Sequence, residues 1–566
     1  MKNIGLFLFL ILGVTGLYLE QQIELLGSLS WIVTVIDYIL VVFLFSESFL
    51  SFLKVPNKKN YVRTHIPSLV FLFVYILLFV LNKSSGLLSE GSFFRGYFFL
   101  VVVRNILLIL KVFGRIRKFT GYLNSIFSKP AQTVVLSFVI VILVGTLLLM
   151  MPFMTVDNYI RPIDAFFTVT SAVCVTGLIV VDTALYFTLA GKITILVLIQ
   201  IGGLGIMLLS YFMVFAFRRS VSLKDRTLLS FMLNESDMKG IVKSVKRIIL
   251  LTFSIEFSGA LLLFPVFIKG GNPLGLAIFH SLFHAISAFC NAGFALYSDS
   301  LESFRGNYLL NFTIAALIIT GGISFSVLTE LSSGIKGLFR KKKINFSINT
   351  KVVLQVSAVL TLIGMLVIYK LEHLSMFYNR PLGEQYLSAF FQSVTLRTAG
   401  FNTISFSALG TGTLMLMIGI MFIGGASGST AGGIKVNTLG VVWAYINSFR
   451  KGKEETLLYK HQVPKDQILQ AFTVILFGVF SIFTVTFIMI LTESGSPEAI
   501  LFEAVSAFAT VGLSTGITGH LTSVGKICII ILMFFGRIGP LTLLTASSRG
   551  EKSSQISYPE ATLLIG

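Results

Sequence analysis

The amino-acid sequence predicts an all-α membrane protein in which four similar units of helix, loop and helix follow about four further transmembrane helices. Three observations predict this class. The 566 residues are 55% hydrophobic and only 12% charged, with a mean hydropathy of +0.89, whereas soluble domains carry about 25% charged residues. Apolar runs of about 20 residues, each long enough to cross a bilayer as a helix, recur along the chain. After residue 130, one pattern of span, short apolar segment, glycine loop and span occurs four times.

The expected transmembrane helices are apolar runs near residues 5–19, 30–53, 66–82, 94–113, 131–151, 192–216, 245–268, 308–330, 351–371, 412–447, 468–491 and 524–547. The first run also fits the apolar part of a signal peptide. Because no small-residue cleavage site follows it and Glu20 comes directly after, we interpret it as a retained span.

Lysine and arginine residues gather in alternate loops, near residues 54–63, 115–129, 218–247, 336–343 and 450–465. The positive-inside rule places all of these loops in the cytoplasm, together with the amino terminus. The formal net charge of +19 therefore indicates orientation, and we expect no nucleic-acid surface. Three scattered cysteines predict neither a disulfide framework nor a metal cluster.

An internal repeat is the most informative feature. Four loops at intervals of roughly 110 residues end in a glycine, and they are residues 170–177, 286–293, 393–400 and 505–512. Apolar segments near 163–172, 276–288, 385–394 and 498–507 precede them and are too short to cross a bilayer. They suit re-entrant half-helices, whose loops are tolerated at membrane depth only inside protein or beside an aqueous cavity. The repeats divide the chain into an amino-terminal bundle, 1–129, and units 130–240, 241–345, 346–462 and 463–566.

The chemistry of these loops indicates a selectivity filter around one central pore. A filter turns successive backbone carbonyls toward the axis to replace an ion's water shell, and glycine adopts the required dihedral angles at little cost. The half-helices would also point their negative ends at the ion. The candidate filter residues are Val173, Cys174, Val175, Thr176, Gly177, Cys290, Asn291, Ala292, Gly293, Arg397, Thr398, Ala399, Gly400, Ala509, Thr510, Val511 and Gly512. We expect Arg397 to anchor its loop. The alternative is that the glycines only allow helices to pack closely.

The run 412–447 is too long for one span and should break at its glycines, because each glycine costs a helix about 1 kcal/mol. The candidate gate residues in this break are Gly424, Gly425, Ser427, Gly428, Ser429, Thr430, Gly432 and Gly433, with Lys435 at its cytoplasmic end. We expect the hydroxyl groups to contact a hydrated ion, and the alternative is a packing kink. Arg537 interrupts a later apolar run, which suggests a functional charge or a side chain that reaches the membrane interface.

Several stretches after residue 130 resemble the Trk/Ktr/HKT superfamily of potassium transporters. They are 176–178 with Asp182, 200–205, 289–294, 397–402, 424–435, 536–541 and 558–560. The resemblance implies four helix–pore-loop–helix units in one chain, a homodimer of such chains and a cytosolic nucleotide-binding regulatory ring (TrkA/KtrA-like) as partner. It also implies that the glycine-rich break lies below the filter as a gate, with Arg537 facing the pore there.

The same resemblance bears on the transported ion. In the plant branch, serine in place of the first filter glycine goes with sodium transport, and all four positions are glycine here, which favours K+. Ktr-type members are often sodium-stimulated and Trk-type members are linked to proton-driven uptake, so Na+ or H+ as a coupling ion stays open. No covalently bound cofactor is expected.

The four spans before residue 130 have two interpretations. Arg104 and Lys111, with Asp37 and Glu47 as counter-charges, faintly resemble a voltage sensor, but their spacing is wrong for one. We therefore favour a packing or dimer-contact bundle.

The sequence as a whole predicts the pore-forming subunit of a potassium uptake system in the inner (plasma) membrane. The alternatives are a broken-helix secondary transporter for another small cation or polar solute, which would show an inverted two-fold repeat and midplane carboxylates, and a non-transporting membrane scaffold or sensor. Catalysis has no support from any motif.

Overall fold

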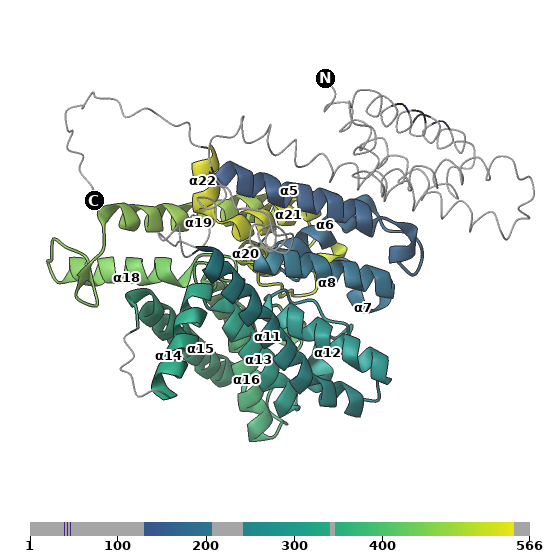
Figure 1. Cartoon of the computed structure of the whole chain (residues 1–566), viewed down its shortest axis with the longest axis horizontal. Helices are drawn as coiled ribbons and strands as arrows, with labels where there is room; N and C mark the ends of the chain where they lie inside the picture. The colour runs from purple at the N-terminus through teal and green to yellow at the C-terminus, as the bar shows by residue number, and fades with distance from the viewer. Residues whose placement is uncertain are drawn as a thin grey trace, which may run out of the picture.

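The computed structural model describes residues 130–205, 241–339 and 346–547, together with residues 35, 39, 42 and 46, and these ranges are mostly helical (Figure 1). The α-helices are α5 (Pro130–Leu149), α6 (Pro162–Val173), α7 (Thr183–Tyr186), α8 (Leu189–Leu204), α11 (Ile241–Lys269), α12 (Leu274–Phe289), α13 (Tyr308–Gly322), α14 (Phe325–Phe339), α15 (Ile348–Glu372), α16 (Leu382–Thr395), α17 (Thr411–Phe422), α18 (Val436–Arg450), α19 (Lys465–Thr492), α20 (Pro497–Ala509), α21 (Ser523–Ile538) and α22 (Pro540–Ser547). Short 3₁₀ turns are η2 (Pro152–Met154), η3 (Glu302–Phe304), η4 (Phe406–Ala408) and η5 (Thr518–His520). Two strands, β1 (Leu457–Leu458) and β2 (His461–Gln462), form one antiparallel hairpin. The expected bundle of residues 1–129 lies outside the described residues, except for those four positions.

Four consecutive sets of helices have the same order of a first helix, a short helix, a loop and a second helix. They are α5–α6–α8, α11–α12–α13, α15–α16–α17 and α19–α20–α21. The short helices are 12 to 16 residues long, which is less than a bilayer requires. A proline stands at the start of each one, at Pro162, Pro273, Pro381 and Pro497. Proline suits that place because its fixed φ is helical and the first turn leaves backbone N–H groups without helical partners anyway.

The second helix of each of the last three sets ends at a bend or a break. The break that the sequence predicts within 412–447 is present, because residues 423–435 separate α17 from α18. The prediction of single straight spans over 308–330 and 524–547 was wrong. Helices α13 and α14 meet at a 110° bend, and α21 and α22 meet at a 91° bend. Apolar segments flank both bends, so hydropathy does not reveal their direction. The second bend, however, lies beside Arg537, and its Gly539 and Pro540 are a helix-ending signal.

The surface of the first helices is apolar, as a lipid environment requires. Phe257 on α11, Leu366 on α15 and Phe480 on α19 are each 60% exposed or more. Within the described ranges, three helices are long and apolar enough to cross a membrane, and five spans result if each bent pair counts as one.

The sets pack in cyclic order. Each short helix contacts the second helix of the preceding set, in the pairs α8 with α12, α13 with α16 and α17 with α20, and α6 contacts α21 of the last set. The contact between the first and last sets also includes an ion pair and a hydrogen bond. Lys526 on α21 and Asp164 on α6 form a buried ion pair at 2.6 Å, and the Gln132 amide donates to the Ala546 carbonyl at 2.9 Å. Figure 1 shows the first and last sets side by side.

Glycines on the second helices allow the short helices to approach closely. The carbonyl oxygens of Val173, Phe289 and Phe508, near the ends of α6, α12 and α20, lie where a Cβ on Gly202, Gly321 or Gly536 would stand. The ends of three short helices are therefore seated directly on neighbouring backbone.

We expect Gly321→Ala to destabilise the protein, because the added methyl group would overlap the Phe289 carbonyl. Overpacking of this kind costs about 1–3 kcal/mol. The measurement is the temperature at which the detergent-solubilised protein loses its monodisperse size-exclusion peak. Gly419→Ala is the matched control, since no atom lies within 4 Å of a methyl group there. Equal melting temperatures for the two variants would contradict this view of the packing.

Candidate functional site

The four loop glycines form a closed ring of backbone contacts. A methyl group at Gly177 would lie 3.0 Å from the Gly293 Cα, one at Gly293 would lie 2.8 Å from the Gly400 Cα, and one at Gly400 would lie 3.4 Å from the Gly512 Cα. A methyl group at Gly512 would lie 2.9 Å from the Gly177 Cα, which completes the circle. No other residue type fits these four positions without displacing a neighbouring loop.

The backbone of each loop turns left-handed twice, at the glycine and two residues before it. The glycines have φ of 92°, 71°, 79° and 89° at Gly177, Gly293, Gly400 and Gly512. Two residues earlier, φ is 56°, 59°, 70° and 54° at Val175, Asn291, Thr398 and Thr510. Positive φ is strained for side chains of these kinds, above all for β-branched ones. Sequence reasoning missed this second set because only asparagine has a known preference for that conformation.

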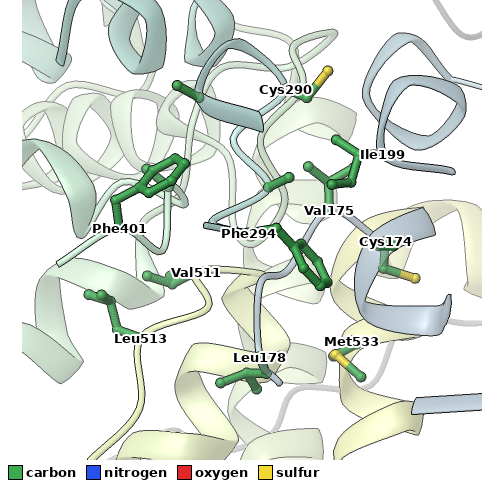
Figure 2. Close-up of a cluster of buried hydrophobic side chains, with 14 of the residues drawn as sticks. Cys174, Val175, Leu178, Ile199, Cys290, Phe294, Phe401, Val511, Leu513 and Met533 are labelled. Atoms are coloured by element: carbon green, nitrogen blue, oxygen red, sulfur yellow. The ribbon is translucent and has the colours of Figure 1, made fainter. Parts of the chain in front are cut away.

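The residues after the glycines fix the loops from outside. Leu178, Phe294, Phe401 and Leu513 are each at most 2% exposed. Figure 2 shows these side chains spread apart, each among other buried apolar groups, with Cys174 and Cys290 in the same region. The loops are therefore held by packing on the side away from the ring.

A cavity of about 280 Å³ opens on one side of the ring, and all four glycines line it. Its wall carries Asp299 and Glu302 and no lysine, arginine or histidine. Burial and the nearby Asp299 raise the pKa of Glu302 above its usual value of 4.5. The Asn402 amide donates to Glu302 at 2.8 Å, which joins the mouth of the cavity to the third loop. Sequence reasoning did not single out either acid, since both lie in a long connection without a motif.

Some predicted filter residues lie at helix ends or bond to helices around the glycine loops. Val173 and Ala509 are the last residues of α6 and α20. The Arg397 guanidinium donates to the Ser357 hydroxyl on α15 at 2.9 Å, so it anchors its loop to that helix. Cys290 lies with its Sγ 3.7 Å from the Gln200 side-chain oxygen and 3.9 Å from a carboxylate oxygen of Glu256.

The glycine-rich loop 423–435 lies against Thr398 and Thr510 of two glycine loops, and neither threonine lines the cavity. Gly432 abuts the Thr510 side chain so closely that a Cβ would overlap it, and a Cβ at Gly424 would lie 3.2 Å from the Thr398 methyl group. Backbone hydrogen bonds tie the loop to the end of α13, from Ala426 to the Gly322 carbonyl at 3.0 Å and from Thr430 to the Gly321 carbonyl at 3.2 Å.

Three side chains of this loop donate hydrogen bonds to backbone carbonyls. The Ser429 hydroxyl donates to the Ala426 carbonyl at 2.7 Å, and the Thr430 hydroxyl donates to the Phe289 carbonyl at 3.2 Å. Lys435 donates to the Ala431 carbonyl at 2.6 Å. These hydroxyl bonds hold the loop, and the expected contacts of Ser429 and Thr430 with a hydrated ion stay a prediction.

Arg537 connects its own helix, α21, to loop 423–435 and to the end of α8. It is the last-turn residue of α21, and its guanidinium donates to the carbonyls of Thr430 in the loop and Gly202 at the end of α8, with Gly203 at 3.5 Å. The interpretation of Arg537 as a side chain that reaches out to the membrane interface was wrong, because its donors turn inward.

The two histidines on α12 have structural partners. His280 bonds the Tyr297 hydroxyl at 3.0 Å, and His284 bonds the His280 carbonyl at 2.7 Å and the Leu296 N–H at 3.2 Å. Among the described residues, no group of three or more histidine, cysteine, aspartate or glutamate side chains is placed to hold a metal ion.

Comparisons with known proteins agree on one family. The family model of TrkH, described as "Cation transport protein", matches residues 101–556. The chain is 40% identical over 444 residues to the Ktr system potassium uptake protein B of Bacillus subtilis (strain 168), which covers 77% of this chain and 97% of that protein. It is 39% identical over 438 residues to the protein of the same name from Vibrio alginolyticus, covering 77% and 94%.

Two further comparisons extend this result. The potassium/sodium uptake protein NtpJ of Enterococcus hirae is 38% identical over 450 residues, covering 77% of this chain and 97% of that protein. The crystal structure of the potassium transporter TrkH from Vibrio parahaemolyticus matches with a TM-score of 0.60 at 19% identity, covering 86% of this chain and 97% of that one, which indicates a shared fold. The chain therefore belongs to the TrkH family of cation transport proteins.

Proposed function

We propose that this protein is the pore-forming subunit of a potassium uptake system and that the glycine ring is its selectivity filter. The observation that carries the proposal is the closed ring of Gly177, Gly293, Gly400 and Gly512 at the floor of an acidic cavity. Backbone oxygens at such a ring replace the water of a dehydrated cation. The names of the Bacillus and Vibrio relatives support K+ as that cation.

The four sets of helices are the pore units of this proposal, with bounds 130–240, 241–345, 346–462 and 463–566, and residues 1–129 precede them as a separate bundle. Their cyclic packing supports four units of one sense around an axis. A secondary transporter with an inverted two-fold repeat would pair its halves differently. In this proposal the acidic cavity faces the outside of the cell and loop 423–435 lies on the cytoplasmic side of the filter, and the positive-inside rule supports that orientation.

Loop 423–435 is the gate of this proposal. It lies against Thr398 and Thr510, and Arg537 ties it to α8, and these contacts support a role for the loop in closing the passage below the filter. A charged guanidinium at that level also lowers the residence of a cation there. Opening requires that the carbonyls of Thr430 and Gly202 exchange Arg537 for other partners.

The partners of this proposal are a second copy of the chain and a cytosolic nucleotide-binding ring, as the family resemblance implies. The names of the Bacillus and Vibrio relatives, which place them in a Ktr system, support the presence of further components. The site of action is the inner (plasma) membrane. Either Na+ or H+ coupling fits, and the name of the Enterococcus relative includes sodium.

We expect expression of the chain with its cytosolic partner to restore growth at low K+ in cells that lack potassium uptake. Gly293→Ser should lower the K+ to Na+ selectivity of flux by about tenfold, which corresponds to about 1.4 kcal/mol, because its side chain displaces the Gly400 backbone. Gly419→Ser on the surface of α17 is the control. Absence of K+ flux from wild-type protein that reaches the membrane would refute the proposed function.

Replacement of Arg537 by methionine should raise K+ flux measured without the cytosolic partner. The variant removes the hydrogen bonds to loop 423–435 and α8 and keeps an apolar stem of similar length. Arg450→Gln, at the exposed end of α18, removes a positive charge elsewhere and should leave this leak unchanged. Tracer uptake into proteoliposomes measures both. A leak no larger in the Arg537 variant than in the Arg450 variant would exclude Arg537 as part of the gate.

Glu302→Gln should raise the K+ concentration for half-maximal uptake by about two- to fivefold, since a nearby carboxylate attracts a cation by up to about 1 kcal/mol in water. The amide still accepts the Asn402 hydrogen bond. Because the pKa of Glu302 is raised, its carboxylate is neutralised at a higher pH than usual. Half-saturation in the wild type should therefore rise as external pH falls through that raised pKa, and the Gln variant should lack this part of the dependence. Identical pH profiles would count against a role for Glu302.

A further inference from the structure

The last turn of each short helix carries a hydroxyl residue whose side chain forms a hydrogen bond with the loop that follows the helix. These residues are Ser171 on α6, Ser287 on α12, Thr395 on α16 and Ser506 on α20, and all four are fully buried. We call them the four braces. None of them was among the candidate filter or gate residues.

Two braces accept a hydrogen bond from a ring glycine itself. The Gly177 N–H donates to the Ser171 hydroxyl at 3.0 Å, and the Gly512 N–H donates to the Ser506 hydroxyl at 3.1 Å. Each bond lies within its own unit, the first or the fourth, and the glycines of these two units are neighbours in the ring.

The other two braces donate to the residue just after the glycine. The Ser287 hydroxyl donates to the Phe294 carbonyl at 2.8 Å, and the Thr395 hydroxyl donates to the Phe401 carbonyl at 2.6 Å. Whether the brace hydroxyl accepts or donates its hydrogen bond correlates with the type of residue after the glycine. That residue is leucine, at 178 and 513, where the brace accepts, and phenylalanine, at 294 and 401, where it donates.

The backbone of each brace holds the same loop a second time. The N–H of the residue before each glycine donates to the brace carbonyl, from Thr176 to Ser171 at 2.8 Å, from Ala292 to Ser287 at 2.7 Å, from Ala399 to Thr395 at 3.0 Å and from Val511 to Ser506 at 2.8 Å. Each brace thus bonds its loop at two points. Its backbone carbonyl bonds the residue before the glycine, and its side chain bonds the glycine or the residue after it.

We propose that the four braces are positioning residues that set the diameter of the glycine ring and thereby its preference for K+ over the smaller Na+. The inference rests on the proposed filter. A ring of backbone oxygens discriminates by size or by the number of its ligands only if the loops resist collapse around a smaller ion. The braces supply that resistance because they stand behind the ring, in buried sites where a lost partner leaves an amide or carbonyl unsatisfied.

The decisive comparison uses Thr395, because two variants separate its hydroxyl from its volume. Thr395→Val keeps the shape and loses the donor, whereas Thr395→Ser keeps the donor. We expect the Val variant to lower the K+ to Na+ flux ratio by roughly tenfold, or about 1.4 kcal/mol, with a much smaller change in maximal K+ flux. The Ser variant should retain the wild-type ratio. Both are measured in proteoliposomes that contain equal amounts of monodisperse protein.

Ser171→Ala, Ser287→Ala and Ser506→Ala should change the ratio in the same direction. Matched controls remove a buried hydroxyl from the same helices without touching a loop. Thr168 on α6 donates to the Asp164 carbonyl at 2.8 Å, and Ser281 on α12 donates to the Ala277 carbonyl at 2.6 Å, both within their own helix. Thr168→Val and Ser281→Ala should therefore keep the wild-type flux ratio.

Inclusion of Gly293→Ser in the series separates the two proposals. If that variant alters the ratio and Thr395→Val does not differ from Thr395→Ser, the braces are only structural and this inference is overturned. If Gly293→Ser also leaves the ratio unchanged, the ring is not the filter and the proposed function fails first. If the alanine variants do not assemble, the Thr395 pair alone decides, since Thr395→Val fills the space of threonine without its hydroxyl and Thr395→Ser keeps the hydroxyl without the methyl group.

Discussion

The architecture depends on one steric constraint, which is that four backbone segments meet so closely at Gly177, Gly293, Gly400 and Gly512 that no Cβ fits between them. Four loops reach a common point only if the helices before them stop midway through the membrane, so the short helices of 12 to 16 residues follow from this requirement. Polar loop backbone at that depth must be satisfied within the protein. The braces and the glycine contacts of the second helices meet that need, and the apolar residues after the ring hold the loops from outside.

The four units share a plan but differ near the ends of their second helices. Gly202 and Gly203, Gly321 and Gly322, and Gly424 and Gly425 stand at the ends of three second helices, and the fourth has Gly536 followed by Arg537. Arg537 thus takes the place of a second glycine and extends to the carbonyls of the first and third units. Asymmetry of this kind is available only because the units lie in one chain, since identical subunits would carry four arginines at this level.

Sequence reasoning predicted the four short helices and their loops because hydropathy, length and the recurring glycine all point to them. It also predicted the break at 423–435, where five glycines make a helix costly. It missed the bends after Gly322 and Ile538, because both flanking segments remain apolar and only tertiary packing decides their direction. It missed the braces and the acids at Asp299 and Glu302, because a single serine or glutamate carries no signal until the fold shows what it faces. The arrangement of the first 129 residues lies outside the described part of the chain.

The ion pair between Asp164 and Lys526 has a consequence for biogenesis. Its two members are 362 positions apart, and they join the first unit to the last. A nascent chain therefore inserts Asp164 long before its counter-charge leaves the ribosome, and an unpaired carboxylate within a membrane is expensive. Asp164 therefore gains its partner only when α21 has been inserted, and a translation product that stops before α21 leaves this carboxylate without its counter-charge.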